Sequence, residues 1–161
     1  MRGMERGRGA KIVYLCREGS QAAAVAAGLH LGILPMDGSP RPRDLLAAPY
    51  FGALGVSDRG FLHFCGMDEA GREIYVAGFG RAFPLVARAI EAAAGIIGLA
   101  PEEFHLVDCT PALGPIARLG GRLWGSLCAP RRGRLFLAWT VGKAYTRLAG
   151  LVARTRESAS R

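Results

Sequence analysis

The sequence lacks several features that would assign its class at once. Its four cysteines lie far apart and form no Cys-X-X-Cys pair, so a zinc site is not predicted and buried thiols are expected. The longest apolar runs, 21–34 and 83–100, are interrupted by Gly, His, Arg or Glu and fall short of a helix of about 20 apolar residues. The start of the chain has no long apolar stretch with a cleavage site. We therefore expect a cytoplasmic protein without a transmembrane segment.

Lysine and acidic residues are scarce, so the chain has a net positive charge that comes mainly from arginine. The 161 residues include 21 Lys and Arg against 13 Asp and Glu, and the net charge is +8. Such an excess favours nucleic acid or an anionic membrane as a partner. However, the arginines are scattered, accompany no recognition motif, and occur beside abundant Ala and Gly, as is typical of a GC-rich coding sequence. Nucleic acid is therefore not the preferred partner.

The order of apolar runs predicts a layered α/β domain. Strands are expected at 11–16, 61–65, 73–78, 104–108 and 134–141. Helices are expected at 21–31, around 44–48, from 84 to about 98, from 110 through 127, and at 144–156. Continuous apolar strands are typical of parallel sheets that are buried on both faces. We predict a mainly parallel sheet of about five strands, with one β-hairpin at the turn GMDEAGR and helices on both faces.

The length of the chain suits a single domain, which would bury roughly 70% of its unfolded surface. Residues 1–10 are polar and glycine-rich, so they are predicted to be a disordered basic N-terminus. The α/β domain is predicted at 11–156 and a frayed C-terminus at 157–161. No internal repeat or second domain is visible.

Three loops follow predicted strands and carry polar groups: CREGSQ (16–21), GFGRAF (78–83) and DCTP (108–111). In open α/β sheets, ligands gather at the carboxyl ends of parallel strands, where helix N-termini offer free N–H groups. The three loops form one site only if their strands are neighbours, and the sequence does not give the strand order.

The first loop contains the groups of an anion site: a glycine for close backbone approach, a hydroxyl, N–H groups and a cation. It is not a Walker loop, which requires GxxxxGK[ST], and alanine stands at position 22, where a cysteine phosphatase loop would need arginine. An ordinary strand-to-helix turn with Ser20 as the N-cap explains the same residues. The candidate ligand-binding residues of this loop are Cys16, Arg17, Gly19, Ser20 and Gln21.

The second and third loops add four candidates. Gly80 is the second glycine of a partial dinucleotide motif that begins at Gly78, but Phe83 stands where that motif needs a small residue, so no cofactor is assigned. Arg81 could clamp a phosphate or carboxylate, or it could be solvated. Asp108 could act as a base or polar partner. Alternatively, Asp108 and Thr110 cap the next helix.

The histidines and the acidic turn are given structural roles. His30, His63 and His105 are not spaced as a metal pair, so core or edge positions are expected. Asp68 and Glu69 are expected to be solvated at a hairpin tip. No metal site is predicted.

Four segments together resemble an uncharacterised Firmicutes family that is classed as domain of unknown function (DUF) 3189. The segments are KIVYLCREGSQAAAVAAGLHLGILP, LLAAPYF, GMDEAGREIYVAGFGR and FHLVDCTP. The resemblance extends from residue 11 to about residue 151 and implies one cytoplasmic domain without an established activity, cofactor or partner. It also implies a glycine–histidine–serine segment in the first loop. Ser20 fits that segment, but the loop histidine is missing.

The preferred hypothesis is an α/β domain that binds a small anionic ligand, such as a phosphorylated metabolite or nucleotide, between the three loops. Ser20 and backbone N–H groups would bind the anion, Arg17 or Arg81 would neutralise it, and Asp108 would be a polar partner or base. Whether the protein is an enzyme stays open.

Two other hypotheses remain. The first is a non-catalytic regulatory or sporulation-associated protein that uses the Arg-rich surface at 131–134 and the C-terminal helix to bind a partner. The second is a thiol role for Cys16 and Cys109, which requires that their strands be adjacent.

Overall fold

The computed structural model describes residues 9–17, 19–98, 100, 103–124 and 131–160. The strands are β1 (Lys11–Cys16), β2 (His63–Met67), β3 (Glu73–Gly78) and β4 (Phe104–Asp108). The helices are α1 (Gln21–His30), α2 (Phe83–Ile96), α3 (Pro115–Trp124), α4 (Arg131–Gly142) and α5 (Tyr145–Ser158). Short 3₁₀ turns are η1 (Asp44–Ala47), η2 (Val56–Asp58), η3 (Gly80–Ala82) and η5 (Thr110–Ala112). Within these described ranges, no helix is long and apolar enough to cross a membrane.

The four strands form one mostly parallel sheet in the order β2-β3-β1-β4. The central strand β1 pairs in parallel with β3 on one side and with β4 on the other. β2 pairs antiparallel with β3, and its register shifts between Phe64 and Gly66. The carboxyl ends of β1, β3 and β4 therefore lie at the same edge of the sheet.

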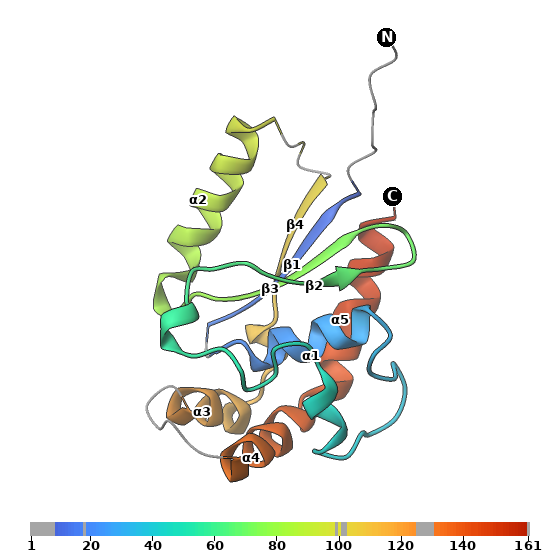
Figure 1. Ribbon diagram of the computed structural model, residues 1–161, viewed down its shortest axis with the longest axis vertical. Coiled ribbons are helices and arrows are strands. Elements are labelled where there is room, and N and C mark those ends of the chain that lie inside the picture. Colours follow the sequence, from blue (N-terminus) through green and yellow to red (C-terminus); the bar gives the residue numbers. More distant parts are fainter. Residues whose placement is uncertain (1–8, 18, 99, 101–102, 125–130, 161) are drawn as a thin grey trace.

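Helices cover both faces of the sheet, but unequally (Figure 1). Alternate residues of β1 point to opposite faces, because the side-chain period of a strand is two. Tyr14 belongs to the larger core, which α1, α3, α4 and α5 complete. Val13 and Leu15 belong to a smaller core that includes Phe83 and Val86 of α2. The prediction of a mixed α/β domain with a mainly parallel sheet is confirmed.

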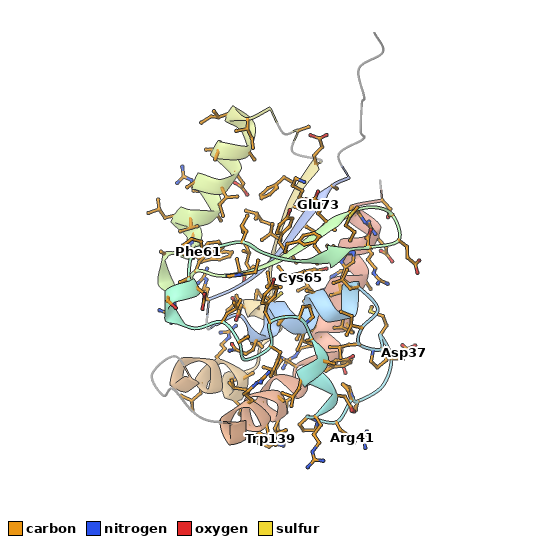
Figure 2. The ribbon with its side chains drawn as sticks, viewed as in Figure 1. Asp37, Arg41, Phe61, Cys65, Glu73 and Trp139 are labelled. Atoms are coloured by element: carbon orange, nitrogen blue, oxygen red, sulfur yellow. The ribbon has the colours of Figure 1, made fainter. Side chains whose placement is uncertain are left out.

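The predicted fifth strand at 134–141 is wrong, because this segment lies within α4. Its run LFLAWTV has the β-branched and aromatic residues that favour a strand. However, the residues it buries, Leu137, Ala138, Thr140 and Val141, follow the i, i+1, i+3, i+4 spacing of a helix face. Phe136 and Trp139 are exposed on the outer side, and Figure 2 shows Trp139 on α4 at the edge of the molecule. Packing of one face therefore overrides the local β propensity.

The segment predicted as one helix at 110–127 is also divided. Residues 110–112 form the short turn η5, and α3 begins at Pro115 after an extended Leu113. The predicted end of this helix falls in 125–130, outside the described residues. Proline at position 115 suits the first turn of a helix, which explains the later start.

A buried chain of polar side chains joins the central strand to one end of α1. The Tyr14 hydroxyl lies 2.7 Å from Nδ1 of His30, and Nε2 of His30 lies 3.0 Å from a carboxylate oxygen of Asp68. Arg72 donates to the same oxygen over 2.6 Å. In addition, Arg156 of α5 donates to the backbone carbonyl of His30. This polar chain, Tyr14–His30–Asp68–Arg72, links β1, α1 and the β2–β3 turn.

The pKa shifts within the polar chain favour a neutral histidine beside a charged carboxylate. Burial lowers the pKa of His30 by more than its hydrogen bond to Asp68 raises it. Burial acts to raise the pKa of Asp68, but hydrogen bonds from Arg72 and His30 outweigh it, so this pKa lies below its usual value. Neutral His30 then donates from Nε2 to Asp68 and accepts from Tyr14 at Nδ1. The expectation of a solvated Asp68 was wrong, since its side chain is only 7% exposed.

Acid should destabilise the fold through His30. Because its pKa in the folded protein lies below the unfolded value of about 6.5, folding favours the neutral form. This contribution is fully present above about pH 6.5 and is lost as the pH falls further, by about 1.4 kcal/mol for each unit of pKa lowering. Urea denaturation from about pH 7 to about pH 5 measures it.

The variant His30→Gln retains one donor and one acceptor for the chain, and we expect it to lose this pH dependence. His105→Gln, a substitution in β4, is the matched control and should keep the wild-type slope. A wild-type slope in His30→Gln would contradict the assignment.

Candidate functional site

The three polar loops meet at the carboxyl edge of the sheet. Cys16 at the end of β1 pairs in register with Gly78 at the end of β3. On the other side, the N–H of Cys109 donates to the carbonyl of Leu15 over 2.8 Å, just after β4. The strand order that the sequence left open therefore brings together all three loops, CREGSQ, GFGRAF and DCTP.

Gly19 and Ser20 form the tight turn that leads into α1. Gly19 has a φ of +118°, a conformation that favours glycine, and a Cβ there would lie 2.5 Å from Oε1 of Gln21. Gly78 passes close to this turn, since a Cβ on it would lie 3.7 Å from the backbone nitrogen of Ser20. The turn and the end of β3 thus lie close together, with little more than the space of one carbon atom between them.

Ser20 occupies the N-cap position without capping the helix. Its side chain makes no capping hydrogen bond, although its carbonyl accepts the N–H of Ala24. The residue is 4% exposed, and its hydroxyl has no hydrogen-bond partner among the described residues. Ser20 therefore holds the predicted N-cap position, but the capping hydrogen bond expected of its side chain is absent among the described residues. Burying a hydroxyl group without a hydrogen-bond partner costs free energy of folding. The burial of the Ser20 hydroxyl therefore needs an explanation other than helix capping.

Thr110 and Asp108 connect the first and third loops. The Thr110 side-chain oxygen accepts the backbone N–H of Arg17 over 3.1 Å. The N–H of Thr110 in turn donates to the Asp108 carboxylate over 2.8 Å, which forms a local turn, whereas the N-cap position of the following η5 turn belongs to Cys109 and has no side-chain capping bond. Both side chains thus hold the loops in place.

Three arginines lie around the loops and make this edge positive. The guanidinium carbon of Arg17 lies 5.3 Å from the ring centroid of Phe83, and Arg17 is exposed. Arg118 of α3 donates to the carbonyl of Thr110 over 3.2 Å. Arg59 is also close, because a Cβ on Gly80 would lie 3.7 Å from its guanidinium nitrogen. Arg81 lies in η3, and its side chain is not among those described.

Arg59 and Arg118 were missed by sequence reasoning. Arg59 belongs to an irregular connector, which a hydrogen bond from Gly60 N–H to the Gly78 carbonyl fixes beside β3. Arg118 reaches the site from a helix whose packing the sequence does not give. No local motif marks either residue, so only the tertiary structure could find them.

The cysteines at this edge are buried thiols. Cys16 and Cys109 directly follow the paired residues Leu15 and Asp108 of adjacent strands, so the neighbour condition for a thiol role is met. Burial raises the pKa of Cys109 well above its usual value, and Cys16 and Asp108 raise it further. The protonated thiol is a poor nucleophile, so this environment does not favour thiolate chemistry.

The space beside the first loop is small. A cavity of about 10 Å³ is lined on one side by the first loop and the start of α1. On the other side lie Leu113, Ala117, Leu137 and Val141. This volume suits at most one water molecule. Gln21, which is buried, folds its side chain toward Gly19 at this place.

A larger cavity of about 550 Å³ lies away from the three loops, beside the polar chain. Its lining includes His30, Asp68, Arg72 and Arg156, together with Met36 and Met67. The polar groups of these four residues bind one another or backbone carbonyls. The carboxyl edge, which has an unpartnered hydroxyl, is therefore the better candidate site.

Among the arginines of the Arg-rich surface at 131–134, the side chain is described only for Arg134. Arg134 is half-buried and donates to the carbonyl of Phe51 over 2.8 Å, so it supports the fold. The side chains of Arg131 and Arg132 are not described.

The sequence model of one protein family, described as "Protein of unknown function (DUF3189)", matches residues 11–157, and the chain belongs to this family. No curated protein and no solved structure matches the chain.

Ser20→Ala should leave the stability almost unchanged. Its hydroxyl has no described partner, so the free energy of unfolding should stay within about 0.5 kcal/mol of wild type or rise. Thr110→Val is the contrasting variant, since it removes the acceptor of the partly buried hydrogen bond from the Arg17 N–H and should cost about 1 kcal/mol. Urea denaturation compares them. A loss above about 1 kcal/mol in Ser20→Ala would show that the hydroxyl is already hydrogen-bonded.

Proposed function

We propose that this member of the DUF3189 family binds a small anionic ligand with a phosphate group at the carboxyl edge of its sheet. The observation that carries the proposal is the buried Ser20 hydroxyl, which has no described partner and lies at the N-terminus of α1. A phosphate oxygen would supply the missing acceptor. The first N–H groups of α1 and the positive end of its dipole favour the same anion.

The charges around the loops support an anionic ligand. Arg17, Arg59 and Arg118 approach the loops from three different segments. Arg17 is exposed and can turn toward a phosphate, where a bidentate charge-assisted bond is strong. Among the described residues of the three loops, the carboxylate is that of Asp108, and it is already bound by the N–H of Thr110, which reduces its repulsion of an anion.

The small cavity determines how the ligand would enter. A water molecule occupies about 30 Å³ of liquid, and a phosphate group needs more space than that. We propose that the phosphate displaces the Gln21 side chain, which lies against Gly19, while the rest of the ligand stays outside beside Arg17 and Phe83. This arrangement suits a phosphorylated metabolite or a nucleotide whose phosphate is at one end.

The proposal is for binding, not catalysis. The thiol of Cys109 is protonated because its pKa is raised by burial. Asp108 is engaged in its local turn and does not stand free as a base.

Calorimetric titration with inorganic phosphate, a nucleoside monophosphate and a sugar phosphate at low salt tests the proposal. Arg17→Ala should weaken binding about tenfold or more, because hydrogen bonds to charged groups contribute about 1.5–3 kcal/mol. Ser20→Ala should weaken binding while the stability is unchanged. Gln21→Ala removes the displaced side chain and should bind as tightly as wild type or more tightly.

Thr146→Ala, an exposed substitution on α5, is the control and should bind like wild type. Two results would refute the proposal. One is that none of the three phosphates binds at millimolar concentration, and the other is equal binding by wild type, Ser20→Ala and Arg17→Ala.

A further inference from the structure

The outer face of α2 is apolar and uncovered. Figure 1 shows α2 as the helix on its own face of the sheet, apart from α1, α3, α4 and α5. Its inner side packs Phe83, Val86 and Ile90 against the smaller core. On the outer side, Leu85 is 73% exposed and Ile96 is 85% exposed. A surface helix normally places polar residues on this side, so the pattern indicates an interface.

The exposed apolar residues of α2 form a stripe whose order of large and small side chains is the same in both directions along the helix. Leu85, Ala89, Ala92 and Ile96 are all exposed and follow spacings of four, three and four residues. Their order of large, small, small, large is the same when read from either end. In an antiparallel pair, Ala89 would face Ala92 of the second copy, and Leu85 would face Ile96. The two central alanines allow the helix axes to approach to about 8 Å.

The charges of α2 also favour a second copy over an anionic partner. The two charged residues of this helix are Arg88 and Glu91, so its face is neutral, although the chain carries a net charge of +8. Both lie on the same flank of the stripe, because they follow Leu85 at three and six residues. In an antiparallel pair, each Arg88 would lie near Glu91 of the second copy. A nucleic acid or an anionic bilayer would instead favour a positive face.

We propose that two copies of this chain associate through the outer face of α2, with the two helices antiparallel about a two-fold axis between Ala89 and Ala92. Such an axis makes the contact self-complementary, because each residue meets the same surface on the other copy. Phe64, which is 48% exposed and packs against Tyr75 beside the smaller core, extends the apolar surface on this face. One helix pair covers less than the roughly 800 Å² per partner of a standard interface, so we expect a dissociation constant in the micromolar range.

Sedimentation velocity of the full chain across micromolar to submillimolar concentrations tests the association. Wild type should shift from the mass of one chain to that of two. Ala89→Glu places a carboxylate in the centre of the contact, opposite the second copy, and should keep the protein monomeric. Thr146→Glu, which adds the same charge on exposed α5, is the matched control and should dimerise like wild type. Wild type that stays monomeric throughout, or a dimer that survives Ala89→Glu, would overturn the proposal.

Charge exchange tests the antiparallel orientation in variants that leave the apolar stripe intact. Arg88→Glu and Glu91→Arg should each weaken the dimer, by about two- to fivefold because exposed ion pairs contribute little. The double variant should regain wild-type affinity. Equal dimerisation in all four proteins would reject the orientation. If wild type stays monomeric and its α2 face binds phosphatidylcholine vesicles, the face has a lipid partner and the proposed dimer is wrong.

Discussion

The hydrogen bonds from Tyr14 through His30 to Asp68 fix the position of α1 relative to the sheet and to the β2–β3 turn. Half of the residues of α1, the helix between the sheet and the outer helices, are alanine, so it packs closely but has few large side chains to fix its position along the sheet. His30 provides that fixation at one end, because both of its ring nitrogens are bound inside the protein. The same helix begins at Ser20, so the position of the candidate site depends on this buried polar contact at the far end of α1.

The two faces of the sheet are built in different ways. One face carries a thick layer in which α1 is buried along its whole length under α4 and α5. The other carries α2, which buries a single stripe and leaves much of its own surface in solvent. β1 supplies residues to both cores. The core on one side is covered by several helices, whereas the core on the other side is covered by α2, and we call this second side the incomplete face. The proposed ligand site lies at the edge of the sheet, while the proposed contact between copies lies on the incomplete face.

Most strands of the sheet could be predicted closely from the sequence. β1, β3 and β4 have the expected bounds, because short, largely apolar runs bounded by glycine or polar residues have few alternatives. The segment 134–141 was misassigned because Phe136 and Trp139 suggest a strand when tertiary packing is unknown. Their exposure shows that the helix places them in solvent. Asp68 was misjudged for a related reason, since a turn sequence does not reveal which helix end it will contact.

The length of α1 has a consequence for how variants of this protein should be interpreted. Its ten residues span about 15 Å and are buried throughout, so we expect the helix to shift as one rigid rod. A substitution that loosens the His30 end would tilt or slide the rod and displace Ser20 at the other end. A loss of ligand affinity in such a variant would therefore result from the displacement of Ser20, and it would not show that the altered residue contacts the ligand.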